Sequence, residues 1–124
     1  MVKAKVYLKA LAIANASAAA QRSFTIDTPS DFKTVRGFYV IRNAGSALLK
    51  IGVRDAAGNQ LLEPVNITHL TVGTSLSIKD RFYRETPCKA GGSKLTVTLE
   101  NFSTLTAAED IDFIYECDNG ENEK

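Results

Sequence analysis

Hydrophobic and polar residues alternate with a period of two along much of the chain, which is the pattern of half-buried β-strands. The pattern is clearest over residues 35–55, where two strands flank a turn. In the first strand, one face carries Val35, Tyr39 and Ile41 and the other carries Phe38 and Val40. A strand that is apolar on both faces is typical of a central position, covered on both sides. This stretch therefore predicts the core of the fold.

The second strand of this hairpin has one inward and one outward face. Leu49, Ile51 and Val53 alternate with Lys50, Gly52 and Arg54. The connecting residues 43–46, Asn-Ala-Gly-Ser, tolerate the backbone angles of a tight turn.

Five further stretches indicate strands, and one residue indicates an interruption. The strands are expected at 23–26, 76–78, 95–99 and 111–117, the last with Ile111, Phe113, Tyr115 and Cys117 on one face. Residues 60–63 form another short strand, which Pro64 is expected to end. Residues 65–72 alternate only loosely.

The N-terminal residues 1–21 partly resemble a signal peptide, with a basic start and small residues at a possible cleavage site. Lys9 interrupts the apolar region, however, so the alternative of a long edge strand is preferred. In that strand Val6, Leu8, Ala10 and Ala12 share one face, and Lys3, Lys5, Tyr7 and Lys9 share the other. Lysines on an outward face protect an edge from unwanted pairing. The sequence therefore predicts the lysine face outward.

About eight short strands separated by turns predict an all-β fold, a single antiparallel β-sandwich. A long first strand and a last strand near the C-terminus favour a jelly roll over an immunoglobulin-like sandwich, and the chain has no Trp for the immunoglobulin pattern. We expect one domain over residues 1–117 and an acidic tail over 118–124. No apolar run approaches the roughly 20 residues of a membrane-spanning helix, so no membrane span is predicted.

The net charge of +1 conceals an asymmetry along the chain. Residues 1–108 contain 14 Lys and Arg against 7 Asp and Glu, whereas residues 109–124 contain 7 acidic residues and one Lys. A basic body can bind nucleic acid. The basic residues are spread singly along strands, however, so complementary patches between neighbouring subunits, or solubility alone, are the preferred interpretation.

Catalytic and metal-binding patterns are absent from the sequence. His69 is the only histidine, and no nucleophile motif lies beside it. One His and two Cys do not supply the four ligands of a zinc site, and the acidic residues do not match a calcium loop. Cys88 and Cys117 could form one bridge, but two thiols are favoured. We therefore expect no enzyme activity, no cofactor and no metal.

The best candidate interaction surface combines a loop and a strand. The polar loop over residues 80–92 mixes aromatic and basic side chains, which could stack on a sugar or base or could anchor the loop to the sandwich. Acidic residues near the last strand supply the opposite charge. The candidate residues are Arg81, Phe82, Tyr83, Arg84, Glu109, Asp110, Asp112 and Glu116.

Three runs carry a resemblance to a known class of proteins. They are F-T-I-D-T-P-S-D-F-K-T-V-R-G-F-Y-V-I-R-N, I-G-V-R-D-A-A-G-N and A-G-G-S-K-L-T-V-T-L, within residues 23–100. Together they resemble small single jelly-roll structural proteins of bacteriophage capsids, of the penton, decoration or head-fibre base type. The resemblance implies self-association or docking on a major capsid protein, and no enzymatic activity. Nucleic acid is not expected as a partner.

The sequence thus leads to two expected functions. The first is a non-enzymatic structural protein of a virion, made and assembled in the host cytoplasm, which contacts other capsid proteins or copies of itself as a homo-oligomer. The alternative is a carbohydrate-binding or adhesion β-sandwich module that uses the loop over residues 80–92. Sugar platforms favour exposed aromatic side chains, especially Trp, which this chain lacks.

Overall fold

The computed structural model describes residues 4–45, 47–70, 88–89 and 93–118, and nearly all of them lie in strands or tight turns. One short 3-10 helix, η1, follows the fifth strand. The elements are β1 (Ala4–Ile13), β2 (Ala20–Asp27), β3 (Thr34–Ala44), β4 (Leu49–Arg54), β5 (Gln60–Asn66), η1 (Ile67–His69), β6 (Cys88–Lys89), β7 (Lys94–Asn101) and β8 (Glu109–Asp118).

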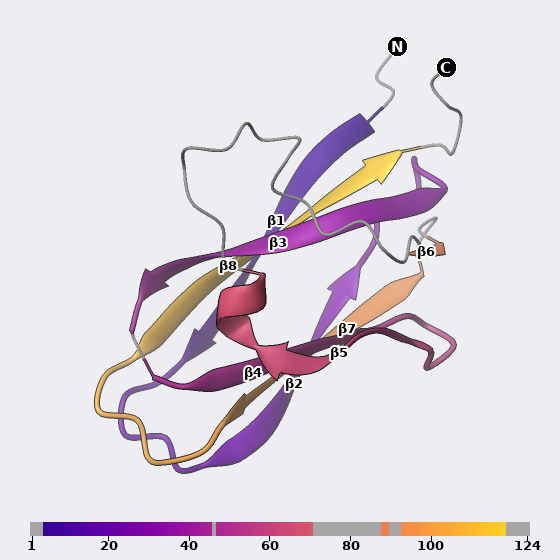
Figure 1. Cartoon of the computed structure of the whole chain (residues 1–124). Helices are drawn as coiled ribbons and strands as arrows, with labels where there is room; N and C mark the ends of the chain where they lie inside the picture. The colour runs from indigo at the N-terminus through magenta and orange to yellow at the C-terminus, as the bar shows by residue number, and fades with distance from the viewer. Residues whose placement is uncertain (1–3, 46, 71–87, 90–92, 119–124) are drawn as a thin grey trace.

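The strands form two four-stranded antiparallel sheets that face each other (Figure 1). The strand orders are β1-β8-β3-β6 and β2-β7-β4-β5. In both sheets a strand from the first half of the chain pairs with one from the second half: β1 with β8, β2 with β7, β3 with β6 and β4 with β5. The chain therefore runs as a long ribbon, folded back at β4–β5 and wrapped into a sandwich. This is the jelly-roll arrangement, and the predicted fold class is confirmed.

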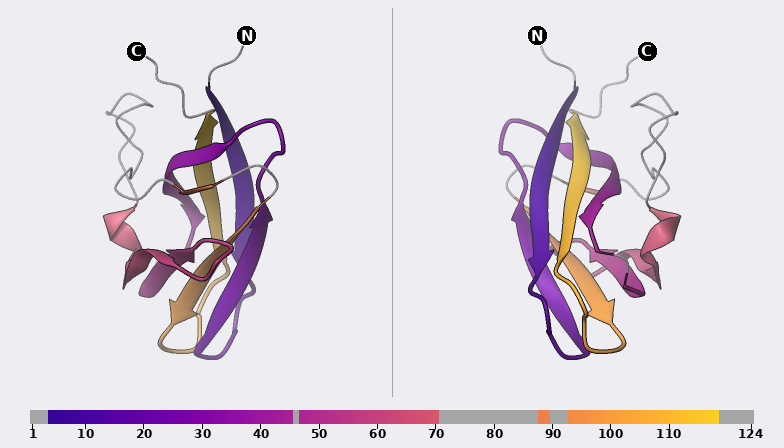
Figure 2. Two further views of the ribbon diagram at one scale, coloured as in Figure 1. Left: turned by 90° about the vertical axis from the view of Figure 1, so that its right-hand side faces the viewer. Right: turned by 90° about the vertical axis from the view of Figure 1, so that its left-hand side faces the viewer.

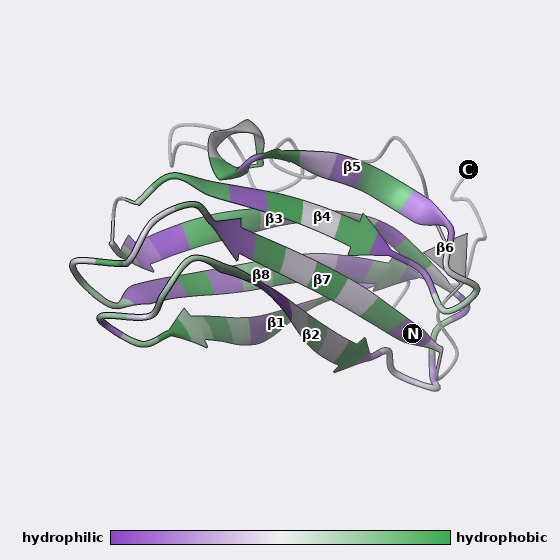
Figure 3. Cartoon of the chain, turned by 90° about the horizontal axis from the view of Figure 1, so that it is seen from below, coloured by the Kyte–Doolittle hydropathy of each residue, from purple (hydrophilic) through white to green (hydrophobic). Residues whose placement is uncertain are grey.

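The core lies between the two sheets and is built from alternate residues of each strand. Bands of opposite hydropathy succeed one another along the strands (Figure 3). Leu95, Val97 and Leu99 of β7 are fully buried, as the alternation predicts. The rings of Phe38 and Phe113 stack across β3 and β8 with their centroids 5.4 Å apart. The inward faces of β4, β7 and β8 are confirmed.

The predicted orientation of the first strand is wrong. Leu11 and Ile13 are buried, and the Tyr7 ring stacks on Tyr115 with the centroids 5.5 Å apart. The odd-numbered residues of β1 therefore face the core, while Val6 and Leu8 point outward. The odd-numbered face carries Lys5 and Lys9 in the first part of the strand and Leu11 and Ile13 in the last part, so the lysines alone were a misleading guide to the outward face. Packing decided, because the larger side chains fill the core.

A bulge changes the predicted faces of β3. The register between β3 and β8 shifts between Val35 and Gly37. The shift places Val35 on the inward face with Phe38 and Val40, away from Tyr39. An extra residue in one strand reverses the alternation beyond it, so Val35 was assigned to the wrong face.

Pro64 does not end β5, contrary to the expectation from the sequence. The strand continues to Asn66, with register shifts against β4 on either side of Val53. Pro64 is tolerated because β5 is the edge strand of its sheet and the ladder is irregular there. Beyond Asn66, residues 67–69 form η1. They lie within the stretch 65–72, in which the sequence alternates only loosely.

The two cysteines belong to the two strands that flank β3. Cys88 and Cys117 are both in register with Val35, on its two opposite sides. Their backbones are thus two strand spacings apart, about 9–10 Å, which exceeds the roughly 7 Å that a disulfide can span. The interpretation as thiols fits this geometry.

The strand at 76–78 lies outside the described residues, as does most of the polar loop 80–92, although residues 88–89 of that loop form β6. Asp118 was assigned to the acidic tail, but it is the last residue of β8 and is buried. The sandwich therefore extends to residue 118.

Candidate functional site

The candidate residues from the sequence fall into two groups. Arg81, Phe82, Tyr83 and Arg84 lie outside the described residues. Glu109, Asp110, Asp112 and Glu116 all lie on β8, between β1 and β3. Only the second group can be placed on the fold.

Glu109 does not belong to a surface, because it is 2% exposed. One carboxylate oxygen accepts hydrogen bonds from the Arg42 guanidinium, from Nε at 3.0 Å and from Nη2 at 2.5 Å. The other accepts from the backbone N–H of Ala47 at 3.1 Å. Gly45 leaves the space for this carboxylate, since a Cβ there would lie 2.3 Å from it. Glu109 therefore anchors the β3–β4 turn, which corrects its assignment as an interaction residue.

Two further acidic residues of β8 also meet partners within the chain. Asp112 accepts a hydrogen bond from the Asn43 amide at 2.9 Å. Asp118 forms an ion pair with Arg36, in which the carboxylate oxygen Oδ2 lies 3.3 Å from Nε of the guanidinium. Asp110 is exposed, and Glu116 is half-buried. Because β8 lies beside β3, with its two arginines, part of the charge asymmetry of the sequence is neutralised inside the molecule.

Three loops gather at the end of the sandwich away from the start of β1 and the end of β8 (Figure 2). Hydrogen bonds join two of them: Ala16 N–H donates to the Leu105 carbonyl at 3.1 Å, and Leu105 N–H donates to the Ser17 carbonyl at 3.0 Å. The third, the β3–β4 turn, is held to the base of the β7–β8 loop by Glu109. These contacts give the end a fixed shape. We call it the loop end, comprising residues 14–19, 45, 47–48 and 102–108.

The loop end is uncharged and partly apolar. None of its residues is Asp, Glu, Lys or Arg, although 23% of the chain is charged. Leu48 is 60% exposed and Phe102 is 45% exposed. A hollow of about 260 Å³ between the β3–β4 and β7–β8 loops is lined by Gly45, Ala47, Leu48, residues 103–107 and Glu109. Sequence reasoning missed this surface, although the absence of charge from three separate loops was visible in the sequence.

A second exposed apolar surface lies on β1. Val6 is 45% exposed and Leu8 is 58% exposed, and Ala10 and Ala12 beside them are also exposed. Since β1 is the first strand of its sheet, this surface lies at an edge.

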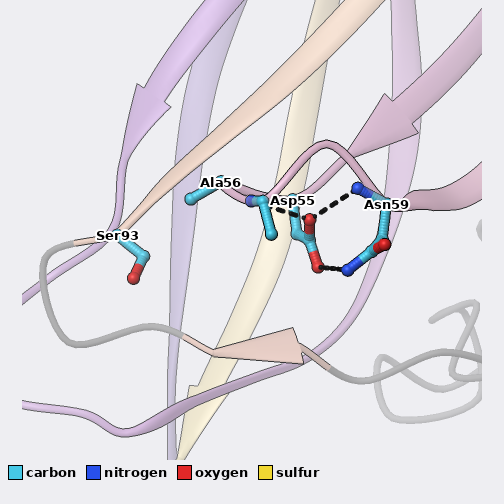
Figure 4. A pocket seen from close by; sticks show the side chains of 5 residues that line it. Asp55, Ala56, Asn59 and Ser93 are labelled. Carbon is cyan, nitrogen blue, oxygen red and sulfur yellow. Dashed lines mark hydrogen bonds between the residues drawn. The ribbon is translucent and has the colours of Figure 1, made fainter.

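The hollow beside the β4–β5 turn holds a carboxylate whose hydrogen bonds serve the turn (Figure 4). Asp55 accepts from the backbone N–H groups of Asn59 at 2.8 Å and Ala57 at 3.0 Å, and from the Asn59 amide at 3.2 Å. These hydrogen bonds hold the pKa of Asp55 below its ordinary value, and the bond from the backbone N–H of Asn59 has the largest effect. The arrangement is that of a stabilised turn.

The outer face of the β2-β7-β4-β5 sheet carries a polar hollow of about 190 Å³. Its lining consists of hydroxyl, amide and guanidinium groups and one proline, from Gln21, Ser23, Arg54, Gln60, Pro64, Thr96 and Thr98. Gln60 is already engaged, since its amide donates to the Leu62 carbonyl at 2.8 Å and its oxygen accepts from Arg54 at 3.0 Å. None of the described residues that line this hollow is aromatic.

Metal and catalytic arrangements can be searched over the part of the chain that the structure describes. There, no group of three or more His, Cys, Asp or Glu side chains is placed to hold a metal ion. His69 ends the single turn of η1. Within the same residues, no helix is long and apolar enough to cross a membrane.

No protein-family model matches the chain, and no curated protein matches it. Among solved structures, dimeric latent PorU from Porphyromonas gingivalis matches with a TM-score of 0.33 and 9% sequence identity. The match covers 95% of this chain and 13% of that one, so the chain spans a small part of the length of PorU. This likeness carries no argument about function.

Proposed function

We propose that the protein is a non-enzymatic structural subunit of a virion that acts through protein–protein contacts. The observation that carries the proposal is the loop end, a fixed and uncharged surface with exposed Leu48 and Phe102. Exposed apolar groups gathered on one surface mark interaction sites. The partner that we assign to it is another copy of the chain, in an oligomer of a capsid.

The fold and the sequence resemblance support the virion setting. Jelly rolls occur in viral capsids, in lectins and in cupins. The fold therefore limits the possible classes of function but does not identify one of them. The resemblance of residues 23–100 to small jelly-roll capsid proteins of bacteriophages favours the first of these classes. On this proposal the protein is made in the host cytoplasm and incorporated into the virion.

The test is the native mass of the purified protein, measured by light scattering over a range of concentrations. We expect a discrete oligomer. Leu48→Lys places a charge on the apolar surface and should weaken association roughly tenfold or more, because burying an unpaired charge is costly. Lys33→Ala is the matched control, since this exposed side chain lies between β2 and β3, outside the loop end. Oligomers that are unaffected by Leu48→Lys and Phe102→Lys would rule out the loop end as their contact.

The polar outer hollow favours one second candidate, a carbohydrate-binding module. Its hydroxyl and amide groups suit the hydrogen bonds of a sugar. The described residues of its lining include no aromatic ring, which makes this the weaker candidate. A glycan screen tests it: binding that Thr98→Ala abolishes would support it, and the absence of any hit would reject it.

A further inference from the structure

The edge of the first sheet is formed by a long strand with an exposed apolar face. Strand β1 has ten residues, and in the sheet that the structure describes β8 is its one hydrogen-bonded neighbour. An edge strand presents a row of backbone N–H and C=O groups, which can pair with another chain. No proline or bulge interrupts the pairing of β1 with β8 over its whole length. The strand is therefore a regular template for a further strand.

The outward side chains of β1 also favour pairing with another strand, because they are apolar and exposed. Val6 and Leu8 account for two of the four large hydrophobic side chains that are most exposed among the described residues. On β8, the outward acidic residues Asp112 and Glu116 flank this apolar strip in register with Ala10 and Val6. The result is an apolar strip at the very edge, bordered by polar groups on its inner side, as at many interfaces.

The two lysines of β1 restrict which strand can pair and in which register. Lys5 and Lys9 lie on the inward side of the strand, where both are exposed. Inward-pointing charges on an edge strand oppose indiscriminate pairing. The strand contains no acidic residue, so any register that places one lysine opposite another is disfavoured.

We propose that β1 pairs antiparallel with β1 of a second copy of the chain, with Leu8 opposite Leu8 at the two-fold axis. In this register Val6 lies opposite Ala10 of the second copy, and Tyr7 lies opposite Lys9 of the second copy. Each large outward side chain except Leu8 then meets a small one, and the aromatic ring of Tyr7 meets a cation. No lysine faces a lysine. In this register the side chains of β1 are thus complementary to those of β1 in the second copy.

The neighbouring registers do not share this property. A two-fold axis at Tyr7 places Lys5 opposite Lys9, and an axis at Lys9 places that residue opposite itself. Axes between residues would pair outward side chains with inward ones, which a continuous pleat does not allow. The charges therefore exclude the two adjacent registers. A register centred on Ala10 also keeps the lysines apart, but it pairs only residues 7–13 of β1, whereas the register centred on Leu8 pairs residues 4–12 and is preferred for that reason.

The paired strands would join two four-stranded sheets into one sheet of eight strands across the dimer. This inference rests on the proposed function, because it supplies one of the self-contacts of an assembling subunit. It uses a surface on β1 and not the loop end, so the two can be tested separately.

Disulfide trapping tests the register in the Cys88→Ser background. Leu8→Cys should form a covalent dimer under mild oxidation, because residue 8 faces its own copy. Val6→Cys alone and Ala10→Cys alone should not, since each residue would be four positions, roughly 13 Å, from its copy. An equal mixture of these two variants should again form covalent dimers. Trapping of Val6→Cys or Ala10→Cys alone, or no trapping of Leu8→Cys, would overturn the proposal.

Native mass separates this inference from the proposed function. Leu8→Lys should weaken the β1 contact at least tenfold, since it places like charges opposite each other. Leu48→Lys is the matched control, because Leu48 is equally exposed, at 60% against 58%. If Leu8→Lys has no effect while Leu48→Lys weakens the oligomer, the β1 contact is wrong and the proposed function stands. The reverse result retains β1 pairing and removes the loop end. A monomer at every concentration contradicts both.

Discussion

At the scale of single residues, the most consequential interaction is the buried pair of Arg42 and Glu109. The carboxylate is nearly inaccessible, and the Arg42 side chain is 16% exposed. Arg42 also donates to the Ala47 carbonyl at 2.6 Å, so the pair binds two sides of the β3–β4 turn. The loop end that we propose as an interface takes its shape from this interaction.

The first prediction concerns Arg42→Ala. The change leaves the Glu109 carboxylate buried without its cation, and the expected loss is about 3 kcal/mol in the free energy of unfolding. Chemical denaturation measures it. The control is Arg54→Ala, which removes an exposed arginine that donates to Gln60, and which should cost less than about 1 kcal/mol. Equal losses for the two variants would contradict the structural role of the buried pair.

At the scale of elements, the β4–β5 turn depends on the ionised carboxylate of Asp55. Its pKa is lowered because backbone N–H groups donate to the charged form. A carboxyl group whose pKa is lower in the folded than in the unfolded protein stabilises the fold above its unfolded pKa, about 4. That stabilisation is lost as the pH falls through the lower, folded-state pKa.

Asp55→Ala should therefore reduce the free energy of unfolding by about 1 kcal/mol at neutral pH. The difference between the variant and the original chain should shrink as the pH falls below about 4. Thermal unfolding of both proteins at pH 7 and pH 2.5 measures this. A difference that stays constant over that range would show that the charge of Asp55 does not contribute.

At the scale of the whole molecule, the arrangement of charges bears on how the protein assembles. The acidic last strand lies between β1 and the arginine-bearing β3, so part of the charge contrast is satisfied inside one subunit. The loop end is uncharged. We expect contacts through this end to persist at high salt, because screening weakens attractions between charges and leaves apolar contacts intact.

Light scattering in 0.1 M and 1 M sodium chloride tests this expectation. The Debye length falls from about 10 Å to about 3 Å over this range. An oligomer of unchanged mass would agree with apolar contacts through the loop end and β1. Dissociation at the higher salt concentration would indicate that charged surfaces hold the subunits together.

Much of the fold could be predicted because strand alternation is a local property. Wherever one face of a strand was clearly polar, as in β4 and β7, its inward residues were identified correctly. The candidate site was less predictable. Glu109 looked like one more acidic residue in a charged segment, and only the position of Arg42 on the neighbouring strand made it an anchor. The loop end combines three segments distant in sequence, so no local pattern indicates it.

The sequence by itself determined the existence of β1, β2, β3, β4, β7 and β8, the two-sheet sandwich and the inward faces of β4, β7 and β8, because the alternation of period two and the turn residues are local properties of the sequence. Tertiary structure decided what neighbouring positions leave open. It turned Tyr7 and Leu11 of β1 inward although Lys5 and Lys9 share their face, because the larger apolar side chains fill the core. It moved Val35 through a bulge and kept Pro64 in a strand, because pairing partners set register and edges tolerate a missing donor.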